Sequence, residues 1–249
     1  GSAGASNILF RNIGFRANDS GITAIFMTAT AKCSRIRIED CDFNVGGSRF
    51  DNCVDLAVTG GTGFDVRITG CTMWHRNVAV KINKVKDIQV TGCRILGGGA
   101  SDVASVGVAL GEVDACSNVH ISNNNIEDVE TGIILSQITT AMVSDNYLLD
   151  VGYGVVQSLG GGGVGSDYNI HDNTITLDDT NGEKGITLLG DGPFTIHGNH
   201  IKCPRITGFA SDPLGVEVAN ASQDVKITDN TIIGFYDQLN DLGASIKVY

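Results

Sequence analysis

A short phrase recurs nine times along this chain, at intervals of 22 to 31 residues. Each copy is an alternating apolar run that leads into a small polar turn, and residues 119–126 and 225–232 carry it most clearly. The central apolar residues of the copies are Phe10, Ile38, Ile68, Val90, Ile121, Val143, Ile170, Ile196 and Ile227. A strand-plus-turn unit repeated at this period is typical of a solenoid, in which each coil stacks on its neighbours.

The regular structure between the copies is predicted to be β as well. Second alternating runs rich in β-branched residues occur at 54–58, 78–82 and 106–110, and again at 186–188, 216–218 and 246–248. Alternation with a period of two indicates strands that bury one face. No segment shows a sustained helical period with caps. We therefore expect an all-β fold.

The turn residues are the most regular part of the phrase. The first residue of each turn is Gly, Asn or Asp, the types that best tolerate a left-handed backbone. These positions are Asn12, Asp40, Gly70, Gly92, Asn123, Asp145, Asp172, Gly198 and Asp229. The position that follows is Cys41, Cys71 and Cys93 in the earlier copies, and Asn124, Asn146, Asn173, Asn199 and Asn230 in the later ones. Stacked at about 4.8 Å, these side chains would form an inward ladder.

With these strands and this inward column, residues 6–249 resemble the right-handed parallel β-helix proteins of the pectate-lyase-like superfamily. The resemblance implies an all-β, right-handed parallel β-helix solenoid of about nine rungs with an inward Asn/Cys ladder. That superfamily holds lyases, hydrolases, epimerases, phage tailspikes and adhesins, so activity has to be argued from a site. The chain looks most like the central domain of a phage tailspike or polysaccharide depolymerase.

The repeat also sets the expected domain organisation. Residues 1–5 are interpreted as a tag scar and lead-in, because the chain begins Gly-Ser. Residues 6–249 are predicted to form one β-helix domain. Since no cap is visible over either end of the solenoid, we expect a fragment of a longer chain, or ends covered by neighbouring domains or subunits.

Charge and cysteine content restrict the partners. The net charge of −11 argues against binding nucleic acid, where Lys and Arg must neutralise phosphates, and gives no support for an anionic membrane. The 7 Cys residues show no C-x-x-C spacing, and a straight column of Cys41, Cys71 and Cys93 suits neither a disulfide nor a tetrahedral metal site. Free thiols in this number favour folding in a reducing cytoplasm.

Two groups of residues are candidates for binding sugar. Alignment of the copies places Arg37, Arg67, Gln89 and His120 in one outward column, where stacked arginines could grip carboxylates or hydroxyls. The alternative is a row of ion pairs, Arg35 with Asp65 and Arg37 with Glu39. Trp74-His75-Arg76 has the composition of a sugar-stacking platform. Its alternative is a Trp packed into the bend with two exposed neighbours.

Three carboxylates are candidates for catalysis. Asp128 and Asp150 occupy matching offsets, and Asp178 falls near the same column one rung further on. Carboxyl groups would stand about 5 Å apart on neighbouring rungs and nearly 10 Å apart across two rungs, the spacings of retaining and inverting glycosidases respectively. Such a cluster could also hold Ca²⁺, as the resemblance implies, although no cofactor is required. The alternative is Asp used simply as a turn residue. His171 and His197 are expected to stack outward without a third metal ligand.

A strip of small apolar residues, Ala79, Ala109, Ile134 and Val156, is predicted to face outward and could form a subunit contact, as in a homotrimer. The sequence thus predicts a tailspike-like domain that binds and cleaves a bacterial surface polysaccharide, on a virion or outside the cell. Two alternatives remain open: a stand-alone polysaccharide lyase, hydrolase or epimerase, and a non-catalytic structural or adhesive solenoid.

Overall fold

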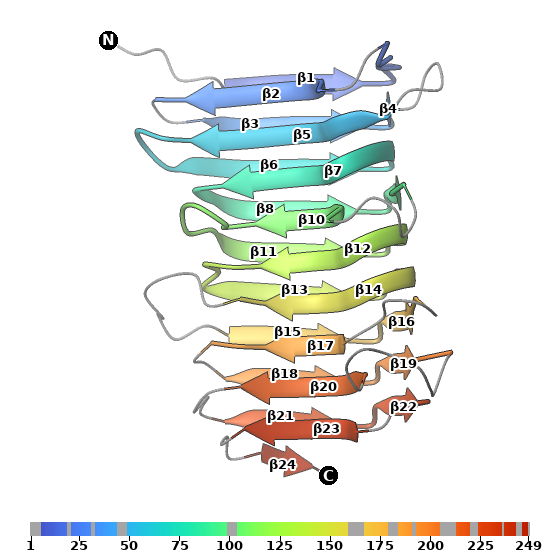
Figure 1. Cartoon of the computed structure of the whole chain (residues 1–249). Coiled ribbons are helices and arrows are strands. Elements are labelled where there is room, and N and C mark those ends of the chain that lie inside the picture. Colours follow the sequence, from blue (N-terminus) through green and yellow to red (C-terminus); the bar gives the residue numbers. More distant parts are fainter. Residues whose placement is uncertain are drawn as a thin grey trace.

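The computed structural model describes residues 6–18, 21–30, 33–43, 49–98, 104–158, 167–178, 184–190, 193–204, 213–219, 224–235, 237–242 and 246–248. The predicted lead-in at residues 1–5 lies outside these ranges. All strand pairings in the described part are parallel, and the chain winds downward as a right-handed coil (Figure 1). The predicted parallel β-helix is therefore confirmed. Among the described residues, no helix has the length and apolar character needed to cross a membrane.

One wall of the solenoid is a 10-stranded sheet, here called sheet A. Each copy of the repeated phrase supplies one of its strands. Its strands are β1 (Ser6–Arg11), β3 (Ser34–Glu39), β6 (Gly63–Thr69), β8 (Val85–Thr91), β11 (Ser117–Ser122), β13 (Thr140–Ser144), β15 (Asp167–His171), β18 (Phe194–His197), β21 (Val225–Thr228) and β24 (Ile246–Val248).

The remaining strands form a second, 14-stranded sheet that folds around a corner into two faces. The side face contains the short strands β4 (Asp42–Phe43), β9 (Arg94–Leu96), β16 (Thr174–Leu177), β19 (His200–Lys202) and β22 (Thr231–Ile233). The front face contains β2 (Thr23–Ala29), β5 (Phe50–Val58), β10 (Val106–Leu110), β17 (Lys184–Leu188), β20 (Leu214–Ala219) and β23 (Asp237–Leu242). Three long strands run through both faces: β7 (Thr72–Asn83), β12 (Asn125–Leu135) and β14 (Tyr147–Gln157).

Sheet A passes into the side face through a turn with a left-handed residue. All nine predicted positions have positive φ: the six Asn and Asp residues at 52° to 56°, and Gly70, Gly92 and Gly198 at 63° to 66°. Most side chains clash with the backbone in this region, whereas Gly, Asn and Asp tolerate it. The narrow choice of residue at this point of the phrase therefore follows from backbone geometry.

The predicted asparagine ladder lies directly after these turns. The backbone N–H and the side-chain Nδ2 of each Asn both donate to Oδ1 of the Asn on the next rung, at 2.9 to 3.1 Å. Nδ2 also donates to a carbonyl on the rung before, as from Asn146 to Ile121 at 3.0 Å. Asn124, Asn146, Asn173 and Asn199 are almost fully buried. The ladder thus satisfies polar groups that would otherwise be buried without partners.

The cysteines continue this column toward the N-terminus. Cys71 Sγ donates to the carbonyls of Thr69 and Ile38, at 3.4 and 3.6 Å. Cys93 joins the cysteine part of the column to the asparagine part, because its backbone N–H donates to Asn124 Oδ1 at 3.0 Å. All seven cysteines are free and buried. Burial raises the pKa of Cys53 and Cys116, so these thiols stay protonated.

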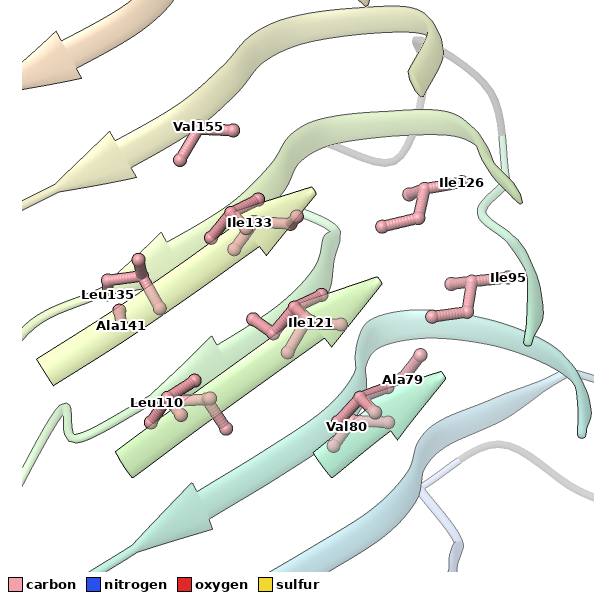
Figure 2. Close-up of a cluster of buried hydrophobic side chains, with 14 of the residues drawn as sticks. Ala79, Val80, Ile95, Leu110, Ile121, Ile126, Ile133, Leu135, Ala141 and Val155 are labelled. Carbon is pink, nitrogen blue, oxygen red and sulfur yellow. The ribbon is translucent and has the colours of Figure 1, made fainter. Parts of the chain in front are cut away.

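The interior is filled by inward side chains from all three walls. In Figure 2, Ile95 and Ile126 project from the side face toward Val80, Ile121 and Ile133. Room for them comes from a column of small front-face residues in matching register: Cys53, Ala79, Gly107, Gly132, Gly154 and Gly185. The prediction that Ala79 faces outward is therefore wrong. Ala79 belongs to the core, because the chain bends between it and the side face.

Candidate functional site

The outer surface of the side face carries the aromatic residues most suited to a sugar. One outward row runs Trp74, Leu96, Glu127 and Leu149 in register. The adjacent row includes Arg94, Asn125 and Tyr147. Trp74 is half-buried and Tyr147 is 44% exposed. Aromatic rings combined with polar side chains suit the apolar faces and hydroxyl groups of a sugar.

Polar side chains on this surface contact one another. Asn125 Nδ2 donates to Glu127 Oε1 at 2.5 Å, and Arg94 Nη2 lies 3.8 Å from Glu127 Oε2. Asn125 Oδ1 is buried and accepts no hydrogen bond. An unpaired buried acceptor is uncommon in folded proteins and is a candidate contact for a ligand donor. We call the outward residues Trp74, Arg94, Asn125, Glu127 and Tyr147 the side-face platform.

Asp128 and Asp150 stand at the corner beside this platform. They follow Glu127 and Leu149, which pair in register, so the two carboxylates lie on adjacent rungs. Both are exposed, and both are left-handed, with φ of 56° and 53°. The predicted alignment of this pair is confirmed. The backbone role that Asp fills in turns applies to the same two residues.

Asp178 does not extend this column. The register between β14 and β16 shifts between Leu149 and Val151, so that Leu177 pairs with Val151 and no residue of β16 matches Asp150. Asp178 follows the strand, and its backbone N–H donates to Val151 at 2.8 Å. The predicted position of Asp178 in the column is therefore wrong, because β16 lacks the bulged residue that Asp128 and Asp150 provide.

The structure separates the three residues of the predicted Trp74 platform. Trp74 lies on the side face, Arg76 is exposed at the corner, and His75 is completely buried. In β7 no residue between Trp74 and Val78 is left-handed, so strand alternation turns His75 inward at the position where Asp128 in β12 turns outward. His75 cannot touch a surface sugar, and the prediction for it is wrong.

His75 is chemically isolated in the core. Neither ring nitrogen has a hydrogen-bond partner. Burial, reinforced by the positive charge of Arg49, lowers the pKa of His75 to about 3. The ring is therefore neutral near pH 7, since protonation would place an unpaired charge inside the solenoid.

On sheet A, the predicted outward column Arg37, Arg67, Gln89 and His120 is present in register. Both arginines contact one carboxylate: Arg37 Nη2 lies 2.5 Å from Asp65 Oδ2, and Arg67 Nε lies 3.2 Å from Asp65 Oδ1. The hydrogen bond from Arg37 lowers the pKa of Asp65. The surface is thus a row of ion pairs, as the alternative held, but the partners differ, because Glu39 pairs with Arg11 instead.

His120 borders an open hollow on the outer surface of sheet A. The hollow has a volume of about 460 Å³ and crosses β11, β13, β15 and β18. Its lining includes Asn118, His120, Met142, Asp167, Asn169 and Thr195. Of these, only His120 was expected from the sequence. The others, four short polar side chains and Met142, were missed because they gain significance only when four coils are stacked.

The front face carries the remaining outward residues. Ala109, Ile134, Val156, Thr187 and Glu217 form one row in register. Ala109 has no exposed surface, although Ile134 and Val156 are partly exposed, as predicted. Glu217 is 7% exposed and lies 2.9 Å from Lys184. This partly buried ion pair could not be predicted from the sequence, which indicates only that both residues lie in strands.

No metal centre is evident among the described residues, where no three His, Cys, Asp or Glu side chains are placed to share an ion. His171 and His197 stack as predicted, with ring centroids 4.8 Å apart and planes 1° from parallel. His171 Nδ1 lies 2.8 Å from Asp172 Oδ2.

The predicted site residues thus fall into two separate groups. Trp74 and Arg76 share the side face and its corner with Asp128 and Asp150. Arg37, Arg67 and His120 lie on sheet A, across the solenoid from that corner (Figure 1). One sugar ring cannot contact both groups.

Comparison with known protein families identifies a matching family model. The family model described as "Periplasmic copper-binding protein (NosD)" matches residues 61–248, most of the solenoid. No curated protein matches the chain, and no solved structure does so either.

Proposed function

The chain belongs to the NosD family, and from this premise we propose that it is an extracytoplasmic β-helix protein that binds a glycan along its side face and cleaves it at Asp128 and Asp150. The observation that supports this most directly is the pairing of two exposed carboxylates on adjacent rungs, beside a surface that carries Trp74 and Tyr147. The location follows the periplasmic description of the family model.

The spacing of the carboxylates favours one reaction. Adjacent rungs of a parallel sheet stand about 4.8 Å apart, close to the roughly 5 Å between the carboxyl groups of retaining glycosidases. In such a reaction one carboxylate attacks the anomeric carbon, while the other, as its acid, protonates the departing glycosidic oxygen. Water then hydrolyses the glycosyl ester, and the second carboxylate takes up the proton that this water molecule releases.

The side-face platform would hold the chain for this attack. A pyranose ring stacked on Trp74 or Tyr147 places its hydroxyls over Asn125, Glu127 and Arg94. Because rungs repeat along the axis, successive sugars can follow successive rungs from Trp74 toward the two rungs that carry Asp128 and Asp150.

The test is a reducing-end assay over a panel of bacterial glycans with three variants. Asn tolerates a left-handed backbone as well as Asp does, so Asp128→Asn and Asp150→Asn remove the carboxylate and keep the turn. Each should lower turnover at least a hundredfold, the scale of general acid–base effects. Asp145→Asn is the matched control, because Asp145 is also left-handed, at φ 56°, but sits at the other corner.

Turnover that survives in both corner variants, or falls equally in Asp145→Asn, would refute cleavage by this pair. Removal of Ca²⁺ with EDTA separates the reaction types. A lyase built on the alternative predicted from sequence would lose activity, whereas hydrolysis by two carboxylates would not.

Copper is the ligand that the family description names. Copper in proteins takes mainly His, Cys and Met ligands. All seven cysteines are buried among apolar residues, the parallel rings of His171 and His197 do not converge on a common point, and no cluster of three donors occurs in the described part. The described residues therefore do not fit a copper centre, and no step of the proposed reaction involves one.

A narrower proposal is that the domain works in a phage tailspike-like homotrimer. The partly exposed Ile134 and Val156 on the front face support it, since adjacent outward apolar residues suit a subunit contact. Light scattering should then give three times the monomer mass, and Ile134→Lys should yield monomer. A monomer at all protein concentrations would rule out the trimer without bearing on the glycan site.

A further inference from the structure

We propose that the hollow on the outer surface of sheet A is a second ligand site, which binds one neutral sugar unit without cleaving it. It is independent of the proposed reaction, because β11, β13, β15 and β18 lie on a different wall from the Asp128–Asp150 corner (Figure 1).

The hollow exists because short side chains sit between long ones in one outward row. That row runs Gln89, His120, Met142, Asn169, Thr195 and Lys226 in register. Asn169 and Thr195 have the smallest side chains of the row and stand between the longer Met142 and Lys226. The lining residues extend over four rungs, or about 14 Å at the strand spacing, which is longer than a single sugar ring.

The lining selects a neutral ligand. It contains no Lys or Arg, and its one charged group is the carboxylate of Asp167, while Lys226 lies beyond Thr195 and outside the lining. An anionic sugar in the hollow would therefore meet a like charge, on a protein of net charge −11. A single exposed carboxylate is also a weak site for a cation, since charged pairs at the surface gain little. Hydroxyl, amide and imidazole groups remain, and these are the usual partners of sugar hydroxyls.

Two residues give the hollow its recognition chemistry. Asn169 Oδ1 is buried and accepts no hydrogen bond, so a rotation of the amide is needed to present it to a ligand. Since the two ends of an amide exchange by a flip, Asn169 can offer a ligand either a donor or an acceptor without breaking a protein hydrogen bond. Met142 is 40% exposed and adjoins His120 in register. Its thioether supplies an adaptable apolar patch for the C–H face of a ring.

The experiment is an NMR titration of the full chain with the methyl glycosides of glucose, galactose, mannose and N-acetylglucosamine, and with glucuronic acid as the anionic comparison. We expect at least one neutral glycoside to shift the His120 and Asn169 signals, and glucuronic acid to bind at least tenfold more weakly. Asn169→Ala should weaken binding about tenfold, the loss of roughly one hydrogen bond.

Gln89→Ala is the matched control, because it lies in the same row but does not line the hollow. It should leave the affinity unchanged, as should Asp150→Asn, so that failure of the cleavage proposal and failure of this one give different results. The proposal is overturned if no neutral glycoside shifts these signals, if glucuronic acid or a simple amine binds better, or if Gln89→Ala weakens binding as much as Asn169→Ala does. Thr195→Ala offers a second hollow variant should Asn169→Ala fold poorly.

Discussion

The residue after each left-handed turn position, from Cys41 to Asn230, takes the same place on its rung in both halves of the solenoid. It is Cys in the N-terminal half and Asn in the C-terminal half. In the C-terminal half, Asn amides join each rung to the next through paired hydrogen bonds. In the N-terminal half, Cys41, Cys71 and Cys93 occupy the same positions, and their thiols donate only weakly, to backbone carbonyls. The halves therefore differ in how strongly a turn couples one coil to its neighbours.

The front face shows a parallel difference. Its inward small column is Cys53 and Ala79 in the N-terminal half, but a stack of glycines from Gly107 to Gly185 in the other. The N-terminal half also packs a larger aromatic cluster, Phe10, Phe15, Phe43 and Phe50, whereas the described core of the C-terminal half has the stacked pair Tyr168–Phe194. One half thus depends more on side-chain packing and the other more on polar bonds and close backbone approach.

The largest expected effect comes from breaking the amide ladder. Asn146→Leu removes the acceptor of two donors on Asn124 and leaves the Ile121 carbonyl without its Nδ2 partner. Since each unpaired buried polar group costs about 1–3 kcal/mol, the free energy of unfolding should fall by about 3 kcal/mol in urea titrations. Cys71→Ala, at the equivalent place among the thiols, should cost about 1 kcal/mol, close to the loss of one buried methylene-sized group. Equal losses would show that the halves do not differ.

The glycine stack should give the next largest contrast. A Cβ on Gly154 would lie 2.3 Å from the Gly185 carbonyl oxygen, which belongs to the backbone and cannot move aside. Gly154→Ala should therefore destabilise by about 2–3 kcal/mol through overpacking. Ala79→Gly in the N-terminal half should cost about 1 kcal/mol. Thermal melts of both variants measure these losses. A Gly154→Ala variant that is as stable as the unchanged protein would contradict the close approach of the Gly154 and Gly185 backbones.

His75 adds a pH dependence to the N-terminal half. The unfolded chain binds a proton at His75 near pH 6.5, whereas the folded protein holds this pKa at about 3. More protons are then bound in the unfolded state between these values, so stability falls as the pH falls. Between pH 7 and pH 5 this residue should lower the free energy of unfolding by about 2 kcal/mol. His75→Leu should remove that part of the slope, and an unchanged pH profile would count against a buried neutral ring.

The smallest expected effect comes from replacing a cysteine of the column with asparagine. Cys93 already donates its backbone N–H to Asn124 Oδ1, so Cys93→Asn would extend the ladder by one rung. A gain of up to about 1 kcal/mol is expected, the net value of one hydrogen bond. A clear loss would mean that the space around Cys93 is shaped for a thiol.

The sequence was a good guide wherever backbone geometry limits the choice of residue. The nine left-handed positions in the turns between sheet A and the side face were all identified, because few residue types tolerate that conformation and the limit acts locally. The Asn and Cys ladder and the outward rows of sheet A followed, since register between coils is fixed by those turns. The fold could therefore be predicted almost completely.

The candidate sites were predicted less well, for a physical reason. At the corner between the side and front faces, one left-handed residue decides which way the next side chains point. Asp128 and Asp150 have it and turn outward, whereas His75 lacks it and turns inward. Sequence offsets alone do not show this, and the absence of such a residue in β16 also explains Asp178. The hollow on sheet A was missed because it depends on side-chain lengths on coils that lie 22 to 31 residues apart.

The amides of the ladder all point the same way, and this gives the solenoid a direction. Within the ladder, each Asn donates to the Asn on the following rung and accepts from the Asn on the rung before, while its Nδ2 also donates to a carbonyl of the rung before. Their dipoles add along the axis, as in a chain of mutually polarised hydrogen bonds. Loss of one amide should therefore affect its two neighbours unequally. Without the Asn146 side chain, two donors on Asn124 lose their acceptor, whereas Asn173 loses only a donor to its Oδ1. Hydrogen exchange should accelerate on the preceding coil first, so that the molecule frays from a lesion toward its N-terminus.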